Sequence, residues 1–279
     1  MKHSKSKIRE LLSGVFAFLL TLLFFILFVC LGLSMGVFND TNVMRKLRES
    51  GYYTEVYKIL DKNTKEIVQK AGFPDKIFDG VITQNKVYVE GDNYTRNKLK
   101  GIDQNIDTEK LKTDLSKNID EHLLQLKVVR TDDLNAGIEN MISVIDEEYH
   151  NCIEIQFLNY YVDFRNDFQK IIKIVIPVVI ILIGIMSYFS IRMRHYKHRG
   201  VRFIMYALIS SSIMTLFAST WLLIKKEYMK PAVTPVFYRN FIASYLKWDI
   251  QIFLYFGMIG LILSMMLMVL TGYLKKMSN

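Results

Sequence analysis

Charge is missing from four long stretches of this 279-residue chain. Residues 11–35, 171–191, 203–224 and 250–274 hold no charged side chain apart from Lys173, which lies at the edge of its run. Each run is about as long as the ~20-residue helix that crosses ~30 Å of hydrocarbon, where a backbone must satisfy its own hydrogen bonds. The runs therefore predict an all-α, polytopic membrane protein with four transmembrane helices.

Cysteine and the common catalytic motifs are also scarce. Cys30 falls in the first apolar run and Cys152 in a polar region, so the two are not expected to pair. The sequence has no HExxH, GxSxG, GxGxxG, Walker A or CxxC motif, which gives protease, hydrolase, nucleotide and redox functions no support. We expect no catalytic residue, no cofactor and no metal, and the protein is predicted not to be an enzyme.

One cluster of candidate metal ligands was weighed against that expectation. It consists of Glu147, Glu148, His150, Cys152 and Glu154. Residues three and four apart share a helix face and can hold a metal ion if a further ligand, such as His122, joins them. A solvated acidic helix face explains the same residues and is the favoured interpretation.

Buried ionisable residues usually mark ion-coupled transporters and pumps, because such residues are costly in lipid. Lys173 and Asp249 lie at the edges of apolar runs, where both are expected to reach water. Ion-coupled transport by this chain is therefore disfavoured.

A polar block separates the first apolar run from the other three. Residues 38–173 contain 20 Lys and Arg against 24 Asp and Glu, although the whole chain carries a net charge of +9. The excess positive charge therefore flanks the apolar runs, where it meets lipid headgroups. Nucleic acid is not an expected partner.

Short basic flanks set the predicted orientation. They are Lys2, Lys5, Lys7 and Arg9 before the first run, Arg192, Arg194, Lys197, Arg199 and Arg202 after the second, and Lys275 and Lys276 after the fourth. The positive-inside rule places all three groups in the cytoplasm. Because the first run is of spanning length, an uncleaved anchor is favoured over a signal peptide.

The predicted order along the chain follows from this orientation. It is a cytoplasmic N-terminus 1–10, transmembrane helix 11–37, an extracytoplasmic helical domain 38–170, transmembrane helix 171–191, a basic cytoplasmic link 192–202, transmembrane helix 203–224, an outer link 225–249, transmembrane helix 250–274 and a cytoplasmic C-terminus 275–279. The predicted location is the cell membrane.

Apolar periodicity predicts two helices at the start of the external domain. The first is expected to begin with Thr41 or Asn42 as its cap and to stop at Gly51. The second is expected to end near Gly72, which precedes a proline.

Two further segments follow. The stretch 78–99 fits either a short strand or a helix capped by Thr83, and the helix is favoured. After a cap at Asp107 or Thr108, Leu111, Leu115, Ile119 and Leu123 recur every four residues, as on the buried face of a helix.

The last helix of the external domain is expected to begin at Thr131 or Asp132. Residues 141–175 contain no glycine or proline. The sequence therefore predicts that this helix continues, or nearly so, into the span 171–191 and couples the domain rigidly to the membrane.

Small residues predict helix packing in two spans. Ala207, Ser211, Thr215 and Ser219 recur every four residues and form a strip that lets a neighbouring helix approach closely. Gly32 and Gly36 form a GxxxG motif at the end of the first span. The alternative for the strip is a polar pore lining that includes Ser210, Ser212 and Thr220.

The outer link is predicted to hold a short helix that lies in the membrane interface. Phe237, Phe241 and Tyr245 fall on one helical face with Trp248 close by. Aromatic rings at this position are typical of the headgroup region.

The overall plan resembles four-span membrane proteins of Gram-positive bacteria that have a helical external insert after the first span. The resemblance lies in the layout and in segments such as 50–53 (SGYY) and 71–74 (AGFP). It implies a plasma-membrane location and an extracytoplasmic domain, and it implies no activity or site residue.

Two functions remain open from the sequence. The first is a non-enzymatic membrane protein whose external domain binds or senses a protein or an envelope component. The alternative is an accessory subunit or a small pore for transport of an uncharged solute. The lipid bilayer is the expected partner in both, and the oligomeric state is not fixed.

Overall fold

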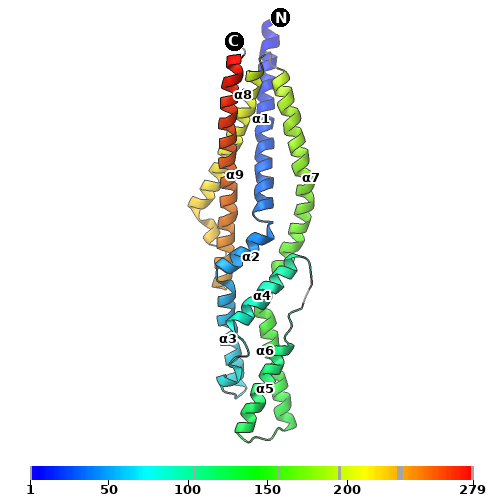
Figure 1. Ribbon diagram of the computed structural model, residues 1–279, viewed down its shortest axis with the longest axis vertical. Coiled ribbons are helices and arrows are strands. Elements are labelled where there is room, and N and C mark those ends of the chain that lie inside the picture. Colours follow the sequence, from blue (N-terminus) through cyan, green and yellow to red (C-terminus); the bar gives the residue numbers. More distant parts are fainter. Residues whose placement is uncertain (1, 104, 156, 194–195, 231–234, 278–279) are drawn as a thin grey trace. The chain divides into compact units, whose positions relative to one another are not determined.

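The structure, a computed structural model, describes residues 2–103, 105–155, 157–193, 196–230 and 235–277 (Figure 1). Within these residues every regular element is a helix, so the predicted all-α class is confirmed. The elements are α1 (Lys2–Met35), α2 (Asp40–Glu49), α3 (Tyr52–Lys70), η1 (Asp75–Phe78), α4 (Gln84–Leu99), α5 (Glu109–Gln125), α6 (Asp132–Ile153), α7 (Phe157–Arg192), α8 (Lys197–Lys225), η2 (Glu227–Met229) and α9 (Val236–Met277). Arg194 and the last two residues of the chain, which belong to the predicted cytoplasmic segments, lie outside the described residues.

Four helices in the described ranges are long and apolar enough to span a membrane, and they contain the four predicted runs. The chain divides into two compact units. Unit 1 comprises Met1–Asn42, Arg165–Ala232 and Ile242–Asn279, and unit 2 comprises Val43–Phe164 and Val233–Phe241. The division falls within α2, α7 and α9, so each of these helices supplies residues to both units.

Two glycines of unit 1 lie where its helices approach closely. A Cβ atom at Gly32 of α1 would lie 2.6 Å from Phe253 Cδ1 of α9. A Cβ atom at Gly260 of α9 would lie 2.7 Å from Phe28 Cζ of α1. Both distances are shorter than real Cβ contacts, so a larger residue at either position would require the neighbouring phenylalanine ring to shift.

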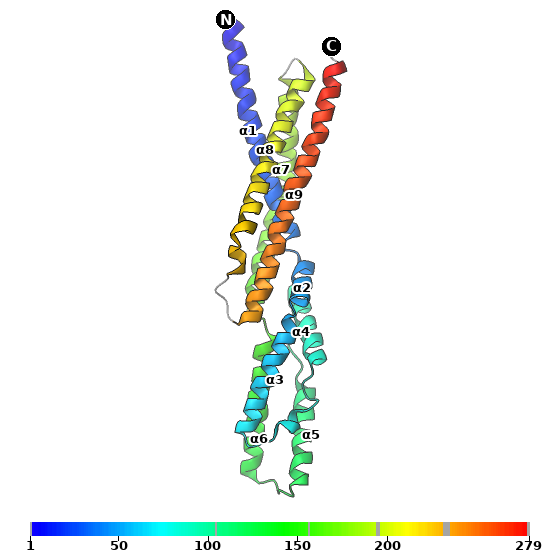
Figure 2. The same cartoon turned by 90° about the vertical axis from the view of Figure 1, so that its left-hand side faces the viewer.

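The strip of small residues on α8 lies in the interior of unit 1, and Figure 2 shows α8 beside α1. Ala207, Ser211, Thr215 and Ser219 are each at most 3% exposed. The hydroxyls donate within α8: Ser211 to the Leu208 carbonyl at 3.0 Å, Thr215 to Ser211 at 2.9 Å and Ser219 to Thr215 at 2.7 Å. These side chains therefore contribute to the helix contact by being small, and they make no polar bond across it.

The segment after α1 is held by side chains from elsewhere in unit 1. Asn42 donates to the Met35 carbonyl at 2.8 Å, and the Tyr245 hydroxyl of α9 donates to the Val37 carbonyl. Buried Arg165 of α7 pairs with Asp40. Because a helix C-terminus leaves its last carbonyls without partners in the helix, the bonds from Asn42 and Tyr245 satisfy carbonyls at and just after the end of α1, and the Arg165–Asp40 pair holds the start of α2.

Asp249 differs from the expectation that it reaches water. Its side chain is 3% exposed and lies against the residue that follows α1, since a Cβ atom at Gly36 would be 3.1 Å from Asp249 Oδ1. Neither carboxylate oxygen has a hydrogen-bond partner among the described residues. The interpretation of Asp249 as a snorkelling topology marker is therefore wrong, because the close approach of α9 to Gly36 covers it.

Helices α3, α4, α5 and α6 of unit 2 pack around a shared apolar core. Leu111, Leu115, Ile119 and Leu123 are all buried, as their spacing predicted. The prediction of a helix within 78–99 is confirmed, because α4 begins after Thr83 and the Thr83 side chain accepts a hydrogen bond from the Lys86 amide at 3.3 Å.

The predicted caps are mostly confirmed. Asp107 accepts from the Glu109 amide at 3.1 Å, and Thr131 accepts from the Leu134 amide at 3.3 Å. The exception is α2, the first helix of the predicted external domain. It begins at Asp40, and the Thr41 amide donates to the Asn39 side chain at 3.0 Å. A cap at Thr41 or Asn42 is therefore wrong by two or three residues.

The helix predicted to continue, or nearly so, from the external domain into the span has a short interruption in the structure. Helix α6 ends at Ile153, Glu154 has extended φ and ψ of −69° and 124°, and α7 begins at Phe157. Side chains two residues apart point about 200° apart on a helix, whereas Ile153 and Ile155 are both buried. The burial of both isoleucine side chains in unit 2 thus accounts for a break in the helix, in a stretch that contains no glycine or proline.

We predict that Gly32→Leu destabilises the protein by roughly 1–3 kcal/mol, because the larger side chain overpacks the contact with Phe253. The thermal midpoint of the purified protein in detergent is expected to fall by several degrees. Gly14→Leu is the matched control on the same helix, since a Cβ atom there has no neighbour within 4 Å. Equal midpoints for the two variants would contradict the role of Gly32.

Candidate functional site

The predicted interfacial aromatics lie on one helix face, but that helix is not a separate interfacial element. Val236–Met277 is a single helix, so the residues predicted for the outer link continue directly into the last span. Phe241 is 1% exposed and Tyr245 9% exposed, which leaves little of either ring for lipid. Phe237 and Trp248 are half-buried. Protein packing of α9, rather than headgroup contact, covers this face.

The candidate metal cluster does not converge. His150 lies 3.8 Å from carboxylate oxygens of Asp146 and Glu154, while His122 packs edge-on against Phe73. The described residues contain no group of three or more His, Cys, Asp or Glu side chains placed to hold a metal ion.

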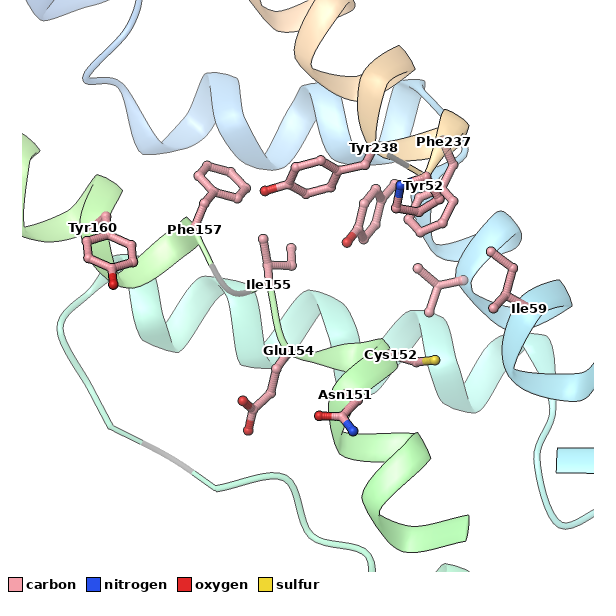
Figure 3. A pocket seen from close by; sticks show the side chains of 12 residues that line it. Tyr52, Ile59, Asn151, Cys152, Glu154, Ile155, Phe157, Tyr160, Phe237 and Tyr238 are labelled. Atoms are coloured by element: carbon pink, nitrogen blue, oxygen red, sulfur yellow. The ribbon is translucent and has the colours of Figure 1, made fainter. Parts of the chain in front are cut away.

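Unit 2 contains a cavity of about 520 Å³ (Figure 3). Its walls come from α3, the end of α6, the start of α7 and the start of α9. The lining residues are Tyr52, Val56, Ile59, Asn151, Cys152, Glu154, Ile155, Phe157, Tyr160, Pro235, Phe237 and Tyr238. The volume falls within the range of about 300–1,000 Å³ that is typical of small-molecule sites.

Interlocking aromatic rings form one wall of the cavity. The rings of Tyr52 and Phe237 lie edge to face with centroids 5.1 Å apart, and those of Phe157 and Tyr238 do the same at 5.4 Å. Phe241 contacts both pairs from behind, 6.1 Å from Tyr52 and 6.3 Å from Phe157. Edge-to-face pairs of this kind stabilise a structure by about 0.5–1.5 kcal/mol each, beyond the effect of burying the rings. The ring contacts therefore hold α3, α7 and α9 together at this wall.

The Tyr52 hydroxyl is the polar group most clearly available to a ligand. Tyr52 is 4% exposed and lines the cavity, and its hydroxyl makes no hydrogen bond with any described residue. Burial raises the pKa of Tyr52 well above its usual value, with smaller contributions from Tyr238, Tyr53 and Cys152. The hydroxyl therefore stays protonated and can both donate and accept.

The Cys152 thiol lies across the cavity from these rings (Figure 3). Its Sγ atom donates to Glu148 Oε1 at 3.4 Å, and the same oxygen accepts from Asn63 Nδ2 of α3 at 2.7 Å. A thiol beside a carboxylate is a weak nucleophile, because the negative charge disfavours the thiolate. Cys152 therefore acts as an apolar wall residue.

Sequence patterns did not identify this cavity. The residues at 52, 157 and 237 are brought together by tertiary packing, and no spacing rule relates them. The only available signal was the clustering of aromatic residues after Gly51, at 157–161 and at 237–245. Of the lining residues, Phe237, Cys152 and Glu154 had been singled out, Phe237 as an interfacial aromatic and the other two as candidate metal ligands.

Comparison with known proteins gives no family: no family model, no curated protein and no solved structure matches the chain.

We predict that Cys152 reacts with a small maleimide at pH 8 at least about tenfold more slowly than an exposed cysteine, because burial and Glu148 disfavour the thiolate. The reference is Lys62→Cys, at a side chain that is 75% exposed, in a chain that also carries Cys152→Ser. Both proteins carry Cys30→Ser, so each has one thiol. Glu148→Gln should accelerate labelling of Cys152, and equal rates for Cys152 and the reference would contradict this environment.

Proposed function

We propose that this chain is a multi-pass membrane protein in which unit 2 binds a small envelope component in its cavity, without catalysing a reaction. The observation that carries the proposal is the cavity itself, with its apolar walls, its few polar groups and a volume suited to a small molecule. No histidine lies among the described lining residues, and the thiol is paired with a carboxylate. Binding is favoured over catalysis for that reason.

The chain connectivity supports a sensing role for this binding. Phe157 and Tyr238 lie in the first turns of α7 and α9, and both helices also contain an apolar run of spanning length. A ligand that orders these two rings acts on helices that cross the proposed membrane. A protein partner of the external domain remains a prediction of the sequence.

The small-pore alternative receives less support. The strip on α8 is buried, and the Ser211, Ser212, Thr215 and Ser219 hydroxyls already donate to carbonyls of the same helix, although Ser210 and Thr220 are exposed.

The proposed membrane is the plasma membrane, with both termini in the cytoplasm and residues 38–170 outside. We predict that Lys62→Cys is labelled by a membrane-impermeant maleimide on intact cells, whereas Lys276→Cys is labelled only after permeabilisation, because the basic flanks are held inside. Both positions are exposed. The reverse labelling pattern would show that the topology is inverted and would contradict an extracytoplasmic role for residues 38–170.

Binding can be tested on the full chain in phosphatidylcholine nanodiscs with an uncharged aryl-diazirine alcohol as photoprobe. We predict that the probe labels cavity residues such as Tyr52 and Tyr238, as located by peptide mass spectrometry. Ile59→Trp should reduce this labelling about tenfold, because the larger indole occupies part of the cavity. Ile59 is half-buried and lines the cavity.

Ile102→Trp is the matched control, since Ile102 is 51% exposed and away from the cavity. Unchanged thermal midpoints would show that both variants fold. The proposal would be overturned if labelling were confined to the apolar helices. It would also be overturned if Ile59→Trp did not reduce labelling of the cavity.

A further inference from the structure

The charge of the cavity limits which ligands it can hold. Its described lining contains no lysine or arginine, and Glu154 lies at its rim. A second carboxylate, Glu148, sits directly behind the Cys152 thiol. An anionic headgroup would face two carboxylates and no cation, so phosphates and carboxylates fit this site poorly.

The aromatic wall offers a favourable partner for positive charge. Figure 3 shows the rings of Phe157, Tyr238, Tyr52 and Phe237 gathered on one side of the cavity, with the Glu154 carboxylate turned away from them. Neighbouring centroids in this row are 5.4, 6.2 and 5.1 Å apart. Cations within about 6 Å of ring centroids are attracted to the electron-rich faces, and the attraction grows when the site excludes water.

The Tyr52 hydroxyl adds a directional contact. Tyr52 lines the cavity, and its hydroxyl has no hydrogen-bond partner among the described residues. Because this hydroxyl oxygen is not among the enclosed side-chain atoms, a ligand in the cavity that offers an N–H donor can bond to it.

We propose that the cavity binds an organic ammonium ion, with its protonated amine against the tyrosine rings and its apolar body against Val56, Ile59 and Ile155. This inference rests on the proposed binding function and names its ligand class. Ring faces and nearby carboxylates attract the charge, while the remaining walls bury the apolar part.

Three nearly isosteric competitors test the inference: 3-phenylpropylamine, 3-phenylpropan-1-ol and 3-phenylpropanoate. Each is titrated against the photoprobe on the full chain in nanodiscs, and labelling is quantified only at cavity residues, so partition into lipid does not count. We predict that the amine competes at a concentration at least about tenfold lower than the alcohol, and that the carboxylate competes least.

Tyr238 provides a matched pair of variants. Tyr238→Phe keeps the ring face and should keep the preference for the amine, whereas Tyr238→Leu removes the face and should reduce the preference several-fold. Glu148→Gln should also reduce it, because it removes a nearby negative charge. Retention of the full preference in Tyr238→Leu would contradict a role for the aromatic wall.

The outcomes separate this inference from the proposed function. If the alcohol or the carboxylate competes as well as the amine, the ammonium assignment is wrong while binding by the cavity stands. If the cavity is not labelled at all, the proposed function fails and the inference fails with it.

Discussion

A backbone in hydrocarbon has no water to bond with, and this constraint applies to the four described helices that are long and apolar enough to span a membrane. It requires helices that satisfy themselves, and it removes the hydrophobic drive that normally joins them, because lipid is as apolar as leucine. Close contact then has to supply the attraction between helices. The glycines at 32 and 260 let α1 and α9 approach within atomic contact, and the hydroxyls of α8 are satisfied inside their own helix. The same close approach buries Asp249 beside Gly36.

Unit 2 is held by a different force. Its helices bury apolar stripes against one another, and the removal of that surface from water stabilises the domain. Packing in such a core is dense, but the aromatic wall of the cavity consists of large, flat side chains that meet edge to face. Rings from α3, α7 and α9 pack against each other there and form a wall of the cavity.

The local features of the fold were predictable because they depend on neighbours in sequence. Thr83 and Thr131 cap helices, and the leucine stripe of α5 is buried, as their spacing indicated. Apart from the cap of α2, which lies at Asn39, predictions failed where distant residues decided the outcome. Glu154 breaks a stretch without glycine or proline because Ile153 and Ile155 are both buried, and Phe241 is covered by Tyr52 and Phe157 rather than exposed to lipid.

The sequence by itself determined that the chain is helical, where its apolar runs lie and which short segments cap its helices, because period, length and local hydrogen bonding are properties of consecutive residues. Only the tertiary structure decided that residues 52, 157 and 237 share one cavity, that α9 runs unbroken from the aromatic wall into the last apolar run, and that Asp249 is buried. The shared cavity and the burial of Asp249 depend on contacts between segments far apart in the chain, which no local pattern encodes.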